Sequence, residues 1–176
     1  MLDLERLVGR ALDLGAEFVE IRWQRSTTSR LFVVDGVIRE LNTGIVEGVG
    51  IRALVGGAWG FATVHGGDPE SVKRALEEAV SLAKASARMK SEKFRLDAPS
   101  NQGSWSARVR KDPAEVGMEE KIRFALELND SARRVDPRVK NVNVGYADTH
   151  SQEEIVNSLG TRVKQETVRT LSLIHI

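Results

Sequence analysis

The sequence predicts an α+β fold, in which packed helices cover one or more mostly antiparallel β-sheets. Strand-like runs that are joined by very short turns favour antiparallel pairing. Other segments repeat apolar residues at helical spacing. The chain has 176 residues, of which 41% are hydrophobic, so it is long enough to bury a real core.

The chain begins with a predicted helix that is followed by strands. Apolar residues keep helical spacing over 4–12, and Gly15 stands where such a helix would end. A strand is predicted over 17–25, because apolar and polar residues alternate there. The run 31–41 predicts a hairpin whose Asp35-Gly36 pair forms a type I′ turn.

The segment 48–62, G-V-G-I-R-A-L-V-G-G-A-W-G-F-A, is the strongest short-range signal in the chain. Apolar residues alternate with glycines around a central Gly56-Gly57 pair, which predicts a second hairpin. Its glycines remove side chains, so we expect the hairpin backbone to pack closely against a neighbour. Together with the preceding runs, this part of the sequence predicts four or five strands.

The second half of the chain alternates helix and strand signals in the same order as the first. Asp68-Pro69-Glu70 starts a predicted helix with an apolar stripe up to position 83. A loop or linker is predicted over 91–111, and Asp112-Pro113 opens a second helical segment. A strand over 139–147 and a hairpin over 154–170 follow. The repeated order of helix, strand and hairpin suggests a duplicated unit.

These signals predict a domain organisation with four parts. An α+β domain occupies 1–90, the loop or linker 91–111, and a second, truncated segment of helix and strands 112–170. The last six residues, L-S-L-I-H-I over 171–176, match the translation of a sequencing adapter, so we expect the natural sequence to end near Thr170. The alternative is an apolar strand that simply ends there.

The overall composition excludes several classes of function. The chain holds 26 lysines and arginines against 25 aspartates and glutamates, a net charge of +1. This balance provides no field that would attract nucleic acid or an anionic membrane. Cysteine is absent, which excludes disulfides and a thiol nucleophile within the chain and fits a reducing compartment. We expect no signal peptide and no membrane span.

The sequence shows little catalytic chemistry of its own. His65, His150 and His175 lie in no metal-binding motif, and His150 is expected to be a surface residue. The glutamate pairs at 17 and 20 and at 119 and 120 lack the apolar surroundings that acid–base catalysis requires. The large aromatic residues are expected to pack in the core rather than to stack on bases; they are Trp23, Trp59, Phe61 and Trp105.

The order of several motifs resembles the amino-terminal domain of the TldD/PmbA (modulator of DNA gyrase) metalloprotease family. The motifs are G-x-E-F-V-E-I-R, V-V-D-G-V-I-R-E-L, the glycine hairpin and the D-P-E helix, with D-P-A-E-V-G-M-E-E-K-I, D-P-R-V-K-N-V and N-S-L-G-T-R-V-K-Q-E later. The resemblance runs from about Leu4 to Thr170. The G-V-G-I-R form looks more like the metal-bearing TldD branch than its PmbA/TldE partner.

The resemblance implies a cytoplasmic, zinc-dependent peptidase that acts on unfolded peptides as a dimer of related subunits. In this family the zinc ligands lie in a carboxy-terminal domain with H-E-x-x-x-H and a later cysteine, so no catalytic, cofactor-binding or metal residue carries over to this chain. The family motif carries over with a structural role, and a peptide-facing role stays open for it; its residues are Gly48, Gly50, Arg52, Gly60 and Phe61. In such proteins this domain helps form the dimer and shapes substrate access.

The sequence therefore predicts the amino-terminal portion of a TldD-like zinc metallopeptidase subunit, inactive by itself. Two alternatives stay open. The first is a PmbA/TldE-like, non-catalytic partner subunit. The second is a stand-alone β-sheet binding module for peptide or nucleic acid, although the neutral charge speaks against nucleic acid and membranes as partners.

Overall fold

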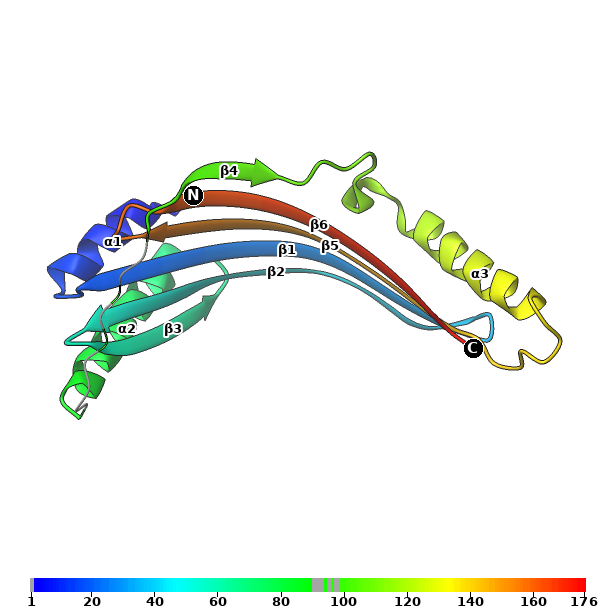
Figure 1. Ribbon diagram of the computed structural model, residues 1–176, viewed down its shortest axis with the longest axis horizontal. Coiled ribbons are helices and arrows are strands. Elements are labelled where there is room, and N and C mark those ends of the chain that lie inside the picture. Colours follow the sequence, from blue (N-terminus) through cyan, green and yellow to red (C-terminus); the bar gives the residue numbers. More distant parts are fainter. Residues whose placement is uncertain (1, 90–93, 95, 97–98) are drawn as a thin grey trace. The chain divides into compact units, whose positions relative to one another are not determined.

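The computed structural model describes residues 2–89, 94, 96 and 99–176, and it has the α+β fold that the sequence predicts. A six-stranded, mostly antiparallel sheet with the order β3-β2-β1-β5-β6-β4 is accompanied by helices (Figure 1). The elements are α1 (Leu4–Asp13), β1 (Phe18–Val34), β2 (Val37–Val55), β3 (Ala58–His65), α2 (Pro69–Ala87), β4 (Gln102–Ser106), the 3-10 helix η1 (Pro113–Glu115), α3 (Met118–Arg134), β5 (Asn143–Asn157) and β6 (Arg162–His175).

Local capping residues fix the helix starts where the sequence predicts them. The Asp3 carboxylate accepts a hydrogen bond of 3.0 Å from the Arg6 amide at the start of α1. At the start of α2, Asp68 accepts a 2.9 Å bond from the Ser71 amide, and Pro69 occupies the first turn. These bonds satisfy amides that lack a partner within the helix, so short polar residues define both starts.

The strands are longer and fewer than the sequence predicts. Over residues 17–64 we expect four or five strands, but β1, β2 and β3 are three continuous ones. The prediction fails where β1 crosses a polar stretch, because Ser26 and Ser29 are buried there and hydrogen-bonded. Ser26 Oγ lies 2.8 Å from Ser151 Oγ, and Ser29 Oγ accepts a 3.0 Å bond from Lys121. Satisfied hydroxyls allow Ser26 and Ser29 to be buried while the strand continues through this polar stretch.

Part of the predicted loop over 91–111 is also a strand. Gln102–Ser106 forms β4, which pairs with β6 at one edge of the sheet. The Arg162 amide donates to Asn101 O at 2.8 Å, and the Ala107 amide donates to Glu166 O at 3.0 Å, so the two strands run parallel. Residues 91–93, 95, 97 and 98 of that predicted loop lie outside the described residues.

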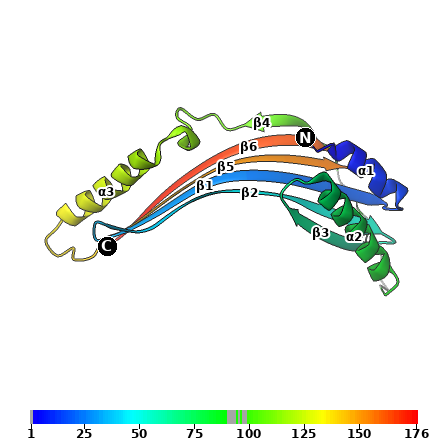
Figure 2. The ribbon, with the colours of Figure 1, turned by 180° about the vertical axis from the view of Figure 1, so that it is seen from behind.

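The chain divides into two compact units, and the long strands contribute residues to both. Unit 1 comprises 1–25, 47–105 and 152–165, and unit 2 comprises 26–46, 106–151 and 166–176. In unit 1, α1 and α2 bury one face of the strands; α2 lies over β3 (Figure 2). In unit 2, α3 packs on its own core. The two cores are formed chiefly by Val19, Ile21, Ile51, Val72 and Leu76, and by Leu31, Val33, Ala125, Val142 and Val144.

Both predicted two-residue turns adopt left-handed backbone conformations. Asp35 and Gly36 have φ of 51° and 79°, and Gly56 and Gly57 have φ of 55° and 74°. Positive φ at both central residues is the type I′ geometry, which matches the twist of adjoining strands. The β1–β2 hairpin after α1 and the β5–β6 hairpin after α3 follow the order that a duplicated unit would give.

Among the described residues, none of the helices combines the length and the apolarity that a membrane crossing requires.

Candidate functional site

The glycine-rich β2–β3 hairpin presents two different faces within unit 1. The strand register pairs Arg52 with Phe61 and Gly50 with Thr63. Because side chains alternate along a strand, these residues lie on the face opposite to the buried Ile51. Gly60 points the other way, toward α2.

Gly60 explains the close approach that the sequence predicts. A Cβ atom placed there would lie 1.9 Å from the Ala79 carbonyl oxygen and 2.5 Å from the Ala83 amide nitrogen of α2. Both atoms belong to helix backbone, which has little freedom to withdraw. Glycine at this position therefore allows α2 to lie directly on β3.

Arg52 is held at the centre of the other face. Its Nε lies 2.9 Å from Glu20 Oε1, and its guanidinium lies 5.5 Å from the centre of the Trp59 ring. The Phe18 and Trp59 rings meet edge to face at 5.8 Å. The ion pair and the ring contacts fix the guanidinium while leaving Arg52 exposed.

Around Arg52 the strand surface is partly bare. A Cβ atom on Gly50 would meet nothing within 4 Å, whereas one on Gly48 would come within 2.9 Å of the Val64 carbonyl oxygen.

Phe61 is 62% exposed and Trp105 is 57% exposed, so the prediction that these two aromatic residues pack in the core is wrong. Residues on either side of Phe61 are buried, which places its ring on the outer side of β3, whereas all five residues of β4 around Trp105 are exposed.

The three histidines lie in three different strands, β3, β5 and β6. His65 and His175 are exposed at strand ends. His150, predicted as a surface residue, is partly buried, with 21% of its side chain exposed. Its Nδ1 lies 3.0 Å from Asp112 Oδ2, and its Nε2 lies 2.6 Å from Glu166 Oε1. Both carboxylates come from other segments, so local sequence gives no sign of them.

The residues in the described part of the chain do not fit a zinc site. No group of three or more histidine, aspartate or glutamate side chains in it is arranged to hold a metal ion. The two carboxylates around His150 bind opposite ring nitrogens, so the three side chains do not converge on one point. A zinc site needs three or four ligands about a common centre, and the sequence has no cysteine to supply one.

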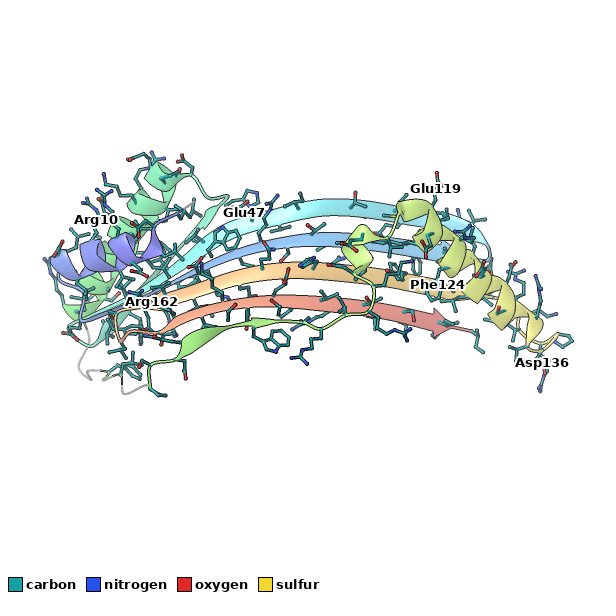
Figure 3. The ribbon with its side chains drawn as sticks, turned by 90° about the horizontal axis from the view of Figure 1, so that it is seen from above. Arg10, Glu47, Glu119, Phe124, Asp136 and Arg162 are labelled. Atoms are coloured by element: carbon teal, nitrogen blue, oxygen red, sulfur yellow. The ribbon has the colours of Figure 1, made fainter. Side chains whose placement is uncertain are left out.

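Three of the four glutamates in the predicted pairs are held by a hydrogen bond or an ion pair, and the fourth lies at the start of α3. Glu17 accepts a 3.0 Å hydrogen bond from the Gly56 amide in the turn, and Glu20 pairs with Arg52. Glu119 lies in the first turn of α3, and Asp136 lies just past its end (Figure 3). Glu120 pairs with Lys111 at 2.6 Å, and that hydrogen bond lowers the pKa of its carboxyl group.

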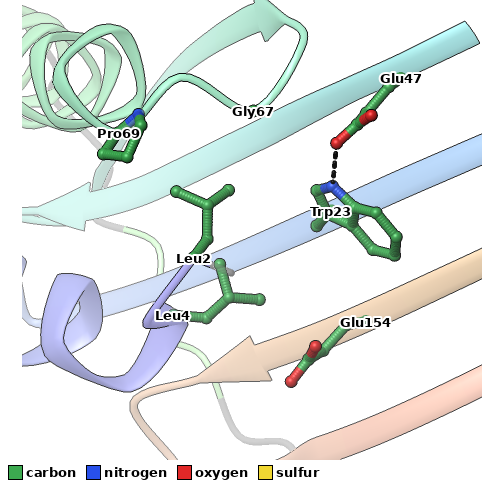
Figure 4. Close-up of a pocket in the computed structure, with 7 residues that line it drawn as sticks. All are labelled: Leu2, Leu4, Trp23, Glu47, Gly67, Pro69 and Glu154. Atoms are coloured by element: carbon green, nitrogen blue, oxygen red, sulfur yellow. Dashed lines mark hydrogen bonds between the residues drawn. The ribbon is translucent and has the colours of Figure 1, made fainter.

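The structure also contains a pocket in unit 1 that the sequence did not predict. It has a volume of about 290 Å³ and lies beside the start of α1 (Figure 4). The Trp23 indole and the Glu47 and Glu154 carboxylates line it. The lining is completed by Leu2, Leu4, Gly67 and Pro69. Five separate segments of the chain contribute, so no local motif could have indicated it.

Two family models match the chain. Residues 19–83 match PmbA/TldA metallopeptidase domain 1, and residues 111–174 match the PmbA/TldA metallopeptidase central domain. Together they cover more than half of the sequence.

Two curated relatives are metalloproteases of archaea. The chain is 25% identical over 176 residues to a metalloprotease of Methanocaldococcus jannaschii, covering 99% of this chain and 38% of the relative. It is 28% identical over 164 residues to a metalloprotease of Methanothermobacter thermautotrophicus, covering 90% of this chain and 34% of the relative. The chain thus spans little more than a third of either relative.

Solved structures share the fold. A protein described as a modulator of DNA gyrase from Thermotoga maritima aligns over 97% of this chain and 41% of its own, with a TM-score of 0.70 and 22% identity. TldE from Thermococcus kodakarensis aligns over 97% and 42%, with a TM-score of 0.68 and 22% identity. A protein described as a modulator of DNA gyrase from Bacteroides thetaiotaomicron aligns over 98% and 41%, with a TM-score of 0.76 and 16% identity.

Proposed function

The chain belongs to the PmbA/TldD metallopeptidase family, and on that premise we propose that it is the amino-terminal, non-catalytic portion of a TldD-like zinc metallopeptidase subunit. The observation that carries this proposal is that the chain belongs to a metallopeptidase family but its described residues hold no metal-binding group. The relatives are metalloproteases of more than twice this length, while the described residues form no metal-binding group. On this proposal the zinc ligands lie outside this chain, and the whole protein works in the cytoplasm.

We further propose that this portion takes part in subunit assembly with a related family member. The β1–β2 hairpin of unit 2 exposes a run of large apolar side chains, a pattern typical of surfaces that bind another protein. They are Phe32 (39% exposed), Val37 (49%), Ile38 (39%), Leu41 (44%), Ile45 (58%) and Val46 (57%).

The same portion is proposed to guide unfolded peptide toward the reaction centre, with Gly48, Gly50, Arg52 and Phe61 of the motif on its peptide-facing side and Gly60 packed against α2. β3 is an edge strand, and an edge strand can add an extended peptide through main-chain hydrogen bonds. Phe61 and Arg52 lie beside the bare backbone at Gly50.

The test compares this chain with a longer version of its gene that includes the downstream coding sequence. We expect the purified chain to cleave no unfolded protein and to retain much less than one zinc ion per molecule after dialysis. The longer protein should cleave unfolded protein and should retain stoichiometric zinc. Cleavage by the chain alone, with stoichiometric zinc on its own side chains, would contradict the proposal.

A PmbA/TldE-like, non-catalytic subunit is the second candidate, because TldE shares the fold over nearly the whole chain. The downstream sequence separates the two candidates. A following H-E-x-x-x-H supports the enzyme, and its absence supports the partner subunit.

A further inference from the structure

The pocket beside α1 combines negative charge with an aromatic wall. The side chains of Glu47 and Glu154 are 34% and 25% exposed, so both carboxylates are partly withdrawn from water. Among the described residues that line the pocket, two are acidic and none is basic. A partly desolvated pair of carboxylates attracts a cation more strongly than exposed carboxylates do.

The indole of Trp23 is fixed in place. Its Nε1 donates a 3.0 Å hydrogen bond to Glu47 Oε1, as Figure 4 shows, and its ring packs against the core of unit 1. The N–H is therefore already used, and what the ring offers is its π face. The face of tryptophan is the side-chain surface that best attracts organic cations.

The remaining wall is apolar. Leu2, Leu4 and Pro69 lie opposite the indole (Figure 4). Pockets for drug-sized ligands and cofactors span about 300–1,000 Å³, and this one is about 290 Å³. Its size suits one long side chain, and its apolar wall suits a side chain with an aliphatic stem.

Two cations of the protein approach the carboxylates without lining the pocket. Arg25 Nε lies 3.9 Å from Glu47 Oε2, and Lys164 Nζ lies 3.3 Å from Glu154 Oε1. Both cations are half exposed, and such pairs contribute little energy and are screened by salt. They orient the carboxylates without saturating them, since each carboxylate can accept several hydrogen bonds.

We propose that this pocket binds the lysine or arginine side chain of an unfolded peptide, with the stem between the leucines and the indole and the cationic head between Glu47 and Glu154. The inference rests on the proposed function, because it names the peptide feature that the non-catalytic portion would select. The binding would favour unfolded segments that carry basic residues.

The experiment titrates the 176-residue chain with short peptides and follows the Trp23 indole N–H signal by NMR. The chain has three tryptophans, so the signal can be assigned with Trp23→Phe. The probes are acetyl-Ala-Lys-Ala-amide, its arginine and norleucine counterparts, and Ala-Ala-Ala-amide with a free amino terminus. We expect the lysine and arginine peptides to shift the signal and to bind about tenfold more tightly than the norleucine peptide, the combined effect of two modest charge interactions, one with each carboxylate.

Variants distinguish binding in this pocket from general electrostatic attraction of the peptide to the chain. Glu154→Gln and Glu47→Gln should each weaken the lysine peptide several-fold, and both together about tenfold, while near-UV circular dichroism stays unchanged. Glu154 does not hold the indole, so its variant tests charge without disturbing Trp23. Glu120→Gln removes an ion-paired glutamate from unit 2 and should change nothing.

Equal binding of the norleucine peptide, unchanged affinity in both glutamine variants, or no shift at millimolar peptide would overturn the inference. Tighter binding of the peptide with a free amino terminus would also overturn it, because the pocket would then select chain ends. None of these results affects the cleavage and zinc assays of the proposed function, so the two can fail independently.

Discussion

Single residues decide how closely α2 approaches the sheet, and Gly60 gives the clearest case. Gly60→Ala would place a methyl group against the backbone of α2 at distances no carbon atom tolerates. We expect the free energy of unfolding, measured in urea, to fall by about 1–3 kcal/mol. Gly50→Ala is the matched control, because a Cβ there meets nothing within 4 Å. Equal stability of the two variants would show that α2 does not rest on Gly60.

Tyr146 links stability to alkaline pH at the same scale. It is the only tyrosine in the chain and is 8% exposed. Burial raises the pKa of its hydroxyl, and a hydrogen bond with Asp148 raises it further. The folded state therefore keeps the proton above the unfolded pKa of about 10, so stability is complete below that pH and declines as pH rises above it.

The measurement is urea unfolding from about pH 8 to about pH 11, together with tyrosinate absorbance of the folded chain. Lysines titrate in both proteins, so the stability of Tyr146→Phe should also decline above about pH 10. Its decline should be less steep than that of the parent, because the variant lacks the tyrosine hydroxyl. Identical slopes would mean that Tyr146 ionises equally in the folded and unfolded states.

At the scale of elements, a buried ion pair attaches α3 to the strands of unit 2. Lys121 Nζ lies 2.7 Å from Asp148 Oδ2, and the two side chains are 5% and 4% exposed. Lys121→Met would leave a buried carboxylate without its cation. We expect a loss of about 3–5 kcal/mol in the free energy of unfolding.

Lys111→Met is the control for that substitution. It breaks an ion pair with Glu120 whose side chains are 62% and 50% exposed, and the expected cost is below about 1 kcal/mol. Urea unfolding of both variants checks the difference. A similar small loss in both would show that Lys121 contributes little beyond its aliphatic stem.

The elements also show which features sequence could predict. The starts of α1 and α2 and the turns at Asp35-Gly36 and Gly56-Gly57 depend on residues within a few positions, and these predictions are confirmed. The continuity of β1 depends on Ser151 and Lys121, which lie far along the chain. Distant partners leave no local pattern, so the long strands were predicted as shorter ones.

At the scale of the whole molecule, the same limit applies to the site. The glycine motif was visible because close packing leaves a local pattern of missing side chains, as at Gly60. The pocket around Trp23 leaves no such local pattern, because Glu47, Gly67 and Glu154 reach it from separate segments. The environment of His150 was missed for the same reason.

The division into two units with separate cores predicts two cooperative regions within one chain. Regions that carry their own apolar core often open separately in hydrogen exchange. Gly60→Ala disturbs the core of unit 1, and Lys121→Met disturbs unit 2. We expect the first variant to speed amide exchange in α2 and at Ile51 while Val144 stays protected, and the second to do the reverse.

Native-state hydrogen exchange of both variants, read residue by residue, checks this reciprocal pattern. Amides in the middle of β1 provide the decisive observation, because that strand contributes Phe18–Arg25 to unit 1 and Ser26–Val34 to unit 2. If each core opens alone, the boundary between fast and slow exchange falls within β1 and lies at about the same residues for both variants. Uniform acceleration along the whole strand in either variant would mean that the continuous backbone couples the two cores into one cooperative unit.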